Sequence, residues 1–480
     1  MKLVRLTASV VSAALLVGCS EAPVYKTPEI PTSANYKEST SIWQPVQPAD
    51  QLPRGDWWKA YQDATLDDMI VRLDKANTDL AIAVGHFDQA TGYAAQARSY
   101  LFPTVSAGTY MTSNRQSQTR ALRSASLPYN VYGDQAAGLM ANYEVDVWGR
   151  VRNTVKAGEA GAQAAAADLE SIHLSLRAEL ANNYLALRML DGQSKLLSDE
   201  IQAYDKALEL TQNRFHGGIA SELDVSRAKV QLDTSKAKLS DISASRALYE
   251  HAIATLVGES ASSFSIAPVV VSIQLPAIPV SVPTTLLQRR PDISAAERRM
   301  VAANAQIGVA KSAFFPTIDL NAAVGYESMN QGALLTAPSL FWVLGPSALL
   351  TIFDAGRREA VVNQAEASFN IAGAEYRSTV LHAFQEVEDN LALLNHLTEE
   401  SVSINDAVTD TQRTLDIAMN RYVEGVASYL EVVTAQAVAE QVRLDELDLR
   451  KRRLQASVNL IRALGGGWDA AQMTAAPEAK

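Results

Sequence analysis

The chain has 480 residues, of which 48% are hydrophobic and 20% are charged, and its formal net charge at pH 7 is −11. A chain of this length and composition can bury a large core, which excludes a disordered protein. The negative charge argues against a nucleic-acid partner, and the single cysteine excludes an intrachain disulfide.

Residues 1–18 are predicted to be a lipoprotein signal peptide. Lys2 and Arg5 give a positive start, and the apolar run that follows over 6–17 is too short to cross a membrane as a helix. The run ends in LVGC, which is typical of the bacterial lipobox. We therefore expect cleavage before Cys19 and lipid (diacylglycerol and an amide-linked chain such as palmitate) on that residue. The alternatives are an ordinary signal peptide and a buried free cysteine.

Two stretches rich in proline, serine and threonine divide the rest of the chain. Residues 19–56 are expected to form a lipidated tether, and residues 259–284 a linker between two halves. The halves, 57–258 and 285–467, are expected to be structural repeats, and residues 468–480 a C-terminal tail.

An internal duplication underlies this division. RFHGGIASELDVSRAKV begins at Arg214 and RYVEGVASYLEVVTAQA begins at Arg421, and seven of their 17 aligned positions are identical. The letters FPT also occur in both halves, at 102–104 and 315–317. Because such self-similarity indicates equivalent structural units, each half is expected to run helix, two strands, long helix, turn and helix.

The first helix of each half is predicted over 57–101 and 284–314. Strands follow, because apolar and other residues alternate with period two over 139–147 and 317–327. Weaker partner strands are predicted at 105–109 and 341–353, and the loops within the two hairpins at 112–133 and 328–340.

These predicted strands have the length that crosses a bilayer when tilted. Strands of a soluble sheet are the alternative, although two distant hairpins make a small sheet. Since a sheet in lipid must close completely, four strands per chain predict closure between chains. Three chains would supply twelve strands.

Long helices follow the strands in both halves. No proline occurs from Trp148 to Arg214 or from Arg357 to Asn420, and both stretches are rich in alanine, leucine, glutamate and arginine. Each stretch corresponds to about 100 Å of helix. In the second, apolar residues recur at alternating steps of four and three, as in coiled coils. Shorter helices are predicted over 222–257 and 429–464.

Glycines mark the ends of these elements. Gly218 and Gly425 are expected to reverse the chain between the long and the shorter helix with a positive φ. Gly356 is expected to form the turn from the last strand into the second long helix, where Asp354 would cap the helix start.

Several segments resemble the TolC-like bacterial outer-membrane factors, in their lipoprotein (NodT-type) branch. They are GDWWKAYQDATLDDMI (55–70), LQRRPDISAAERRMVAANAQIGVAKSAFFPTIDL (287–320), FDAGRREAVVNQAEA (353–367) and VLHAFQEVEDNLALL (380–394). The resemblance implies an α+β membrane protein. Its homotrimer would form a 12-stranded outer-membrane β-barrel continuous with a long periplasmic α-helical barrel. It further implies a periplasmic adaptor (membrane fusion) protein and an inner-membrane pump of the RND type as partners.

The resemblance also implies a gate where the helical hairpins turn. Leu430, Glu431 and Tyr422 fall on positions that line or latch the closed end in the family. The resemblance implies a second acid, as in several members of the family, where this chain has Thr434, and the family's usual arginine where it has Ala427. Three Glu431 carboxylates near one axis would repel one another unless protonated or paired. The alternatives are a solvated Glu431 and a Leu430 in the packing core.

The resemblance further implies that the turns contact the adaptor. The residues concerned are Gly218, Gly425, Ala220, Ser221, Ala427 and Ser428.

The sequence favours one of three functions. A passive trimeric export duct, lipid-anchored in the bacterial outer membrane, explains the lipobox, the duplication, the strands and the helices together. A periplasmic coiled-coil scaffold or adaptor leaves the strands unexplained. An enzyme is not expected, because no catalytic set, metal cluster or phosphate loop stands out. Beyond the lipid on Cys19, no cofactor is expected.

Overall fold

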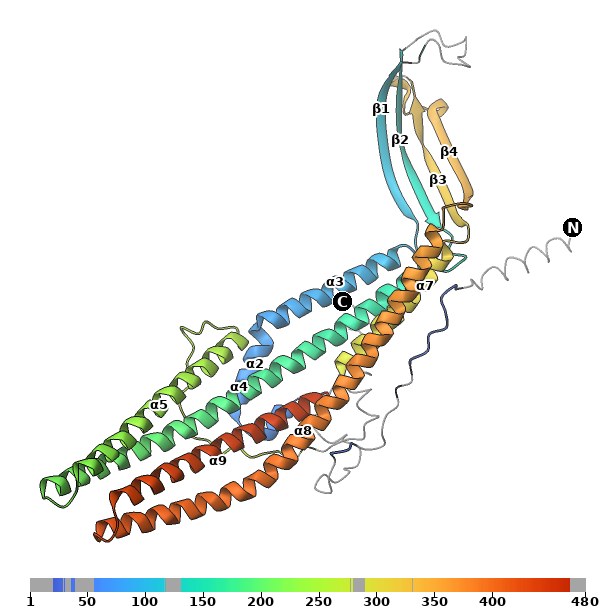
Figure 1. The fold of residues 1–480 in the computed structure, drawn as a ribbon. Coiled ribbons are helices and arrows are strands. Elements are labelled where there is room, and N and C mark those ends of the chain that lie inside the picture. The colour runs from blue at the N-terminus through green and yellow to red at the C-terminus, as the bar shows by residue number, and fades with distance from the viewer. Residues whose placement is uncertain are drawn as a thin grey trace. The chain divides into compact units, whose positions relative to one another are not determined.

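The computed structural model describes residues 20–28, 30, 36–38, 56–115, 117, 131–276, 278, 290–329 and 331–466 (Figure 1). The predicted lipidation site Cys19, most of the tether and the predicted tail lie outside the described residues. The chain divides into two compact units, each assembled from three stretches. The sheet unit comprises Met1–Glu29, Phe87–Ala165 and Ala296–Tyr376, and the helical unit comprises Ile30–His86, Ala166–Ala295 and Arg377–Lys480.

The sheet unit contains one antiparallel sheet in the order β1-β2-β3-β4 (Figure 1). Its strands are β1 (Thr104–Arg115), β2 (Val131–Glu144), β3 (Thr317–Ser328) and β4 (Leu340–Leu349). The two predicted hairpins therefore join through β2 and β3. The expected loop 112–133 was wrong at both ends, because 112–115 pair with 131–134 as strand. Their sequence alternates too weakly to reveal this.

A pair of glycines lets the two hairpins approach closely. Gly138 of β2 lies opposite Gly325 of β3. A Cβ on Gly138 would lie 2.7 Å from the carbonyl oxygen of Val324, and one on Gly325 would lie 2.5 Å from that of Ala137. Both distances are shorter than real Cβ contacts. The junction between the two repeats therefore requires glycine at this register.

The sheet has two open edges and exposed apolar faces. Within the described chain β1 pairs only with β2, and β4 pairs only with β3. Val105 of β1 is 65% exposed and Trp342 of β4 is 72% exposed. Unpaired edges of long apolar strands are templates for further strand pairing. This sheet thus has the form of a segment of a larger closed structure.

An aspartate caps each long helix just after the strands. Asp146 accepts hydrogen bonds from the amides of Val151 and Arg152 at 3.0 and 2.9 Å. Asp354 accepts from the amide of Arg358 at 3.2 Å, and Gly356 has a φ of +87°. A carboxylate here satisfies free N–H groups at the positive end of the helix dipole. The expected roles of Asp354 and Gly356 are confirmed.

The helices follow the order of the two repeats. They are η1 (Trp57–Tyr61), α2 (Ala64–Ala76), α3 (Thr78–Ser99), α4 (Arg150–His216), α5 (Glu222–Leu256), α7 (Pro291–Ser312), α8 (Arg357–Val423) and α9 (Tyr429–Ala463), and the 3₁₀ turns η2 (Gln331–Ala333) and η3 (Ala337–Ser339) lie in the second strand loop. The helices α4 and α8 have 67 residues each, and α5 and α9 have 35 each. None of the described helices is both long and apolar enough to span a membrane.

The single helix expected over 57–101 was wrong. It is interrupted at Asp63, whose side chain accepts from the amides of Thr65 and Leu66 at 2.9 and 3.1 Å and so starts α2. It is interrupted again at Asn77, whose side chain accepts from the amide of Leu80 at 2.8 Å. Side chains that bond to nearby backbone favour such helix starts.

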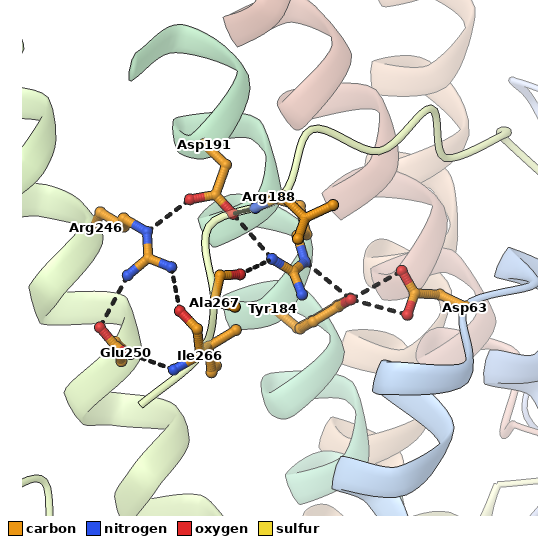
Figure 2. Close-up of polar contacts among 9 residues, drawn as sticks. Asp63, Tyr184, Arg188, Asp191, Arg246, Glu250, Ile266 and Ala267 are labelled. Carbon is orange, nitrogen blue, oxygen red and sulfur yellow. Dashed lines mark hydrogen bonds and ion pairs between the residues drawn. The ribbon is translucent and has the colours of Figure 1, made fainter. Parts of the chain in front are cut away.

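A buried ionic network ties the segment after α5 to the helices of the helical unit (Figure 2). Asp191, 1% exposed at its side chain, binds Arg188 at 2.9 Å and Arg246 at 2.6 Å. Arg188 also donates to the hydroxyl of Tyr184 at 3.0 Å, and Arg246 donates to the carbonyl of Ile266 at 2.6 Å. Each buried charge thus has several partners, which is the condition for burying it.

Candidate functional site

Both helical hairpins of the helical unit, α4–α5 and α8–α9, turn at the two copies of the duplicated motif (Figure 1). Gly218 has a φ of +73° and Gly425 a φ of +79°. The amide of Ile219 bonds back to the carbonyl of Arg214 at 2.8 Å, and that of Val426 to the carbonyl of Arg421 at 2.9 Å. Such bonds beside a left-handed glycine end a helix.

The residues after the two turns begin the shorter helices in different ways. Ser221 accepts from the amide of Asp224 at 3.2 Å, and its own amide donates to Asp224 at 3.1 Å, which forms a capping box. Ser428 has the same place before α9 but makes no side-chain capping bond. Ala220 and Ala427, which precede the two serines, are half-buried.

Glu431 is the counterpart of Asp224, and it pairs with Arg421 of its own hairpin at 3.3 Å. The two side chains are 47% and 52% exposed. An ion pair so accessible to water contributes little stability, on the order of 0–1 kcal/mol. Its main effect is to place one positive charge beside each Glu431 carboxylate.

Tyr422 is buried rather than directed into solvent. It is 6% exposed, and its ring lies 5.2 Å from that of Tyr429, which is 3% exposed. Ala228 of α5 and Val432 of α9 complete this small apolar cluster. The cluster therefore joins the first hairpin to the second near their turns.

Arg214 of α4 contacts the end of α8. Its Nη1 donates to the carbonyl of Tyr422 at 2.8 Å and its Nη2 to that of Val423 at 2.9 Å. The guanidinium also lies over the Tyr422 ring, 4.5 Å from the ring centroid. This contact connects the first copy of the duplicated motif to the second.

Leu430 and Glu431 line a groove of about 590 Å³ between α8 and α9. Thr434 lies in the same groove, and its hydroxyl donates to the carbonyl of Leu430 at 2.8 Å. Leu430 is 46% exposed and so does not belong to the packed core of the chain. The groove thus has one acidic residue, with Arg421 on its opposite wall.

Tyr422, Leu430 and Glu431, which the family resemblance indicated, all lie beside the turn between α8 and α9, and their role in a gate stays a prediction. Arg214, Arg421 and Tyr429 were not predicted. The first two are the opening residues of the duplicated motif, so the alignment of the two copies contained a signal for them. Tyr429 had none, because a tyrosine after a serine cap indicates neither burial nor a ring partner.

The described residues contain no group of three or more His, Cys, Asp or Glu side chains that could hold a metal ion.

Comparisons with known proteins give consistent results. A family model described as outer membrane efflux protein matches residues 69–259 and 282–466. The toluene efflux pump outer membrane protein TtgC of Pseudomonas putida is 31% identical over 461 residues, covering 95% of this chain and 94% of TtgC. The cation efflux system protein CusC of Escherichia coli is 28% identical over 461 residues, covering 94% and 96%.

Among solved structures, the outer membrane protein VceC of Vibrio cholerae is 29% identical. It matches with a TM-score of 0.81 over 86% of this chain and 99% of VceC.

Proposed function

Because the chain belongs to the outer membrane efflux protein family, we propose that it is the outer-membrane duct of a tripartite efflux system. Three copies form the duct. A periplasmic adaptor opens it, and an inner-membrane pump of the RND type supplies the energy. The duct itself is passive and catalyses no reaction. It needs no cofactor.

The observation that carries this proposal is the four-stranded sheet with two unpaired edges, in the same chain as two 67-residue helices. Three such sheets would pair edge to edge into twelve strands, an even number as in bacterial outer-membrane barrels. The other candidate function, a coiled-coil scaffold, does not explain why the chain has apolar strands with open edges.

Fractionation of cells that express the chain tests the proposal. We expect a heat-modifiable trimer in the outer-membrane fraction, and increased accumulation of toluene or of a metal cation in cells that lack the chain. Two probes are needed because the relatives named for toluene and for cations are similarly distant. A soluble periplasmic monomer would instead support the scaffold.

The gate of this duct lies at the turn between α8 and α9. Leu430 and Glu431 narrow the lumen there, and Tyr422 holds the turn in place from within the packed cluster. The turn residues Gly218, Ala220, Ser221, Gly425, Ala427 and Ser428 form the adaptor contact. Exposure of most of these turns in the single chain supports that role.

Cys19 carries the lipid that anchors the N-terminal tether to the outer membrane. Attached acyl chains give stable membrane binding through burial of many CH₂ groups. The variant Cys19→Ser should lose incorporation of radiolabelled palmitate, because serine offers no thiol to the lipid transferase. Cys19→Ser cells that still incorporate the label would contradict this assignment. Cys19→Ala serves as a second, smaller replacement.

A further inference from the structure

The two copies of the duplicated motif use their first residue differently. Arg214 and Arg421 occupy equivalent places near the ends of α4 and α8. Arg421 stays within its own hairpin and pairs with Glu431. The position equivalent to Glu431 in the first copy is Asp224, which bonds to Ser221 in the capping box instead. The Arg214 side chain reaches across to the second hairpin.

The atoms that Arg214 contacts lie where a cation is favoured. The carbonyls of Tyr422 and Val423 belong to the last turn of α8, beyond which no further amide of the helix follows. The Tyr422 carbonyl also accepts from the amide of Gly425 at 3.1 Å, so Arg214 is its second donor. The negative end of the helix dipole lies there as well. A guanidinium presents two parallel N–H donors that fit two neighbouring oxygens, which an ammonium group does not.

The same side chain also covers the buried tyrosine. The Arg214 guanidinium lies 4.5 Å from the centroid of the Tyr422 ring, within the range of a cation–π interaction. Tyr422 in turn packs on Tyr429 at the start of α9. A single side chain of α4 therefore fixes both the backbone end of α8 and the ring that packs against the start of α9.

We propose that Arg214 is the clasp that holds the end of α8, and with it the gate residues Leu430 and Glu431, to the end of α4 within one chain. The inference rests on the proposed function and deepens it, because it names the contact that must break when the second hairpin moves. Arg214 acts through α8 and is a positioning residue rather than part of the lumen wall.

The test is single-channel conductance of purified trimers in planar lipid bilayers. We expect Arg214→Ala to raise the open probability on the order of tenfold, because two charge-assisted hydrogen bonds and a cation–π contact are lost. Arg214→Lys keeps the charge but not the paired donors, so it should give an intermediate increase. Arg227→Ala is the matched control, because Arg227 of α5 lies near the same hairpin turn but pairs only loosely, at 3.7 Å, with Asp224 of its own hairpin. Its loss should leave the open probability unchanged.

Trimer content on gels and the thermal unfolding midpoint separate a loose gate from a misfolded chain. If Arg214→Ala impairs folding, Arg214→Lys alone decides the question. A wild-type open probability in folded Arg214→Ala or Arg214→Lys trimers would overturn the proposal, as would an equal increase in Arg227→Ala. Glu431→Ala separates the Arg214 contact from the gate itself. If Glu431→Ala raises conductance while both Arg214 variants behave as wild type, only the clasp fails. If neither wild type nor any of these variants conducts in the bilayer, the proposed function fails.

Discussion

Asp191 shows how strongly the energetic contribution of a charged side chain depends on its burial. It lies buried between Arg188 and Arg246, where its removal would leave two guanidinium groups with little water to shield them from one another. Asp199, two turns further along α4, pairs with Lys195 at 2.5 Å, yet both side chains are more than half exposed, at 55% and 62%. The ion pairs of Asp191 and Asp199 have similar distances, but they should contribute very different free energies to folding.

Asp191→Ala is predicted to destabilise the helical unit by about 3–5 kcal/mol, because it leaves buried charge unpaired. The matched control Asp199→Ala should change stability by no more than about 0.5 kcal/mol. Chemical denaturation followed by circular dichroism measures both values. Equal effects of the two variants would show that the network in Figure 2 is not a determinant of stability.

The packing of α4 against α5 and α9 buries two carboxyl groups, those of Glu200 and Glu440. Their side chains are 11% and 1% exposed. Lys238 of α5 donates to Glu440 at 2.6 Å, and Arg443 of α9 lies 3.5 Å from Glu200. Burial first, and then the charge of Glu440, raise the pKa of Glu200 to about 7, although Arg443 and Lys238 oppose the shift.

This packing predicts a pH-dependent stability. The folded state favours protonated Glu200, so its contribution is complete below the ordinary glutamate pKa of 4.5 and is lost as the pH rises through about 7. One such group changes the free energy of unfolding by at most about 1.4 kcal/mol per pH unit. The thermal unfolding midpoint of the wild-type protein should therefore fall as the pH is raised from 5 to 8.

Glu200→Gln should remove that part of the pH dependence, because glutamine does not titrate. Glu209→Gln, which replaces an exposed glutamate on the same helix, should leave the dependence as in wild type. A midpoint of Glu200→Gln that falls with pH as steeply as that of wild type would contradict the assignment of the titrating group.

The elements themselves differ in how far the sequence predicts them. The shorter helices α5 and α9 were expected to within one residue, because the duplicated motif places a glycine turn shortly before each of them. The breaks at Asp63 and Asn77 were missed because an aspartate or asparagine in a helical pattern reveals its capping role only once its backbone partners are known. The start of β2 at Val131 was missed because its first residues do not alternate.

The contacts of the site were harder to predict than its location. The duplicated glycines located the turns, and the family resemblance indicated Tyr422, Leu430 and Glu431. The reach of Arg214 to α8 joins residues 208 positions apart. Helical periodicity describes which face of one helix is apolar, but it does not specify which carbonyl of another helix that face meets.

The unpaired strand edges of the single chain explain why the whole molecule should be an assembly of several copies. One sheet of four strands has two open edges, while relatives of the same family are named as outer-membrane components of efflux pumps. Strand edges require partners, and three copies provide them. In the gate that we propose, the three Glu431 carboxylates would lie near one another, and Arg421, which pairs with Glu431 at 3.3 Å within one chain, would offset part of their repulsion.

The measurement that tests this account most directly is the single-channel conductance of purified trimers, comparing wild type with Leu430→Ala/Glu431→Ala. We expect rare, small openings in wild type. In the double variant we expect a conductance several times larger, because the two side chains that would line the lumen at each α8–α9 turn are shortened. Trimers of equal and small conductance in both proteins would contradict a gate at these turns, and trimers that never conduct would contradict a duct.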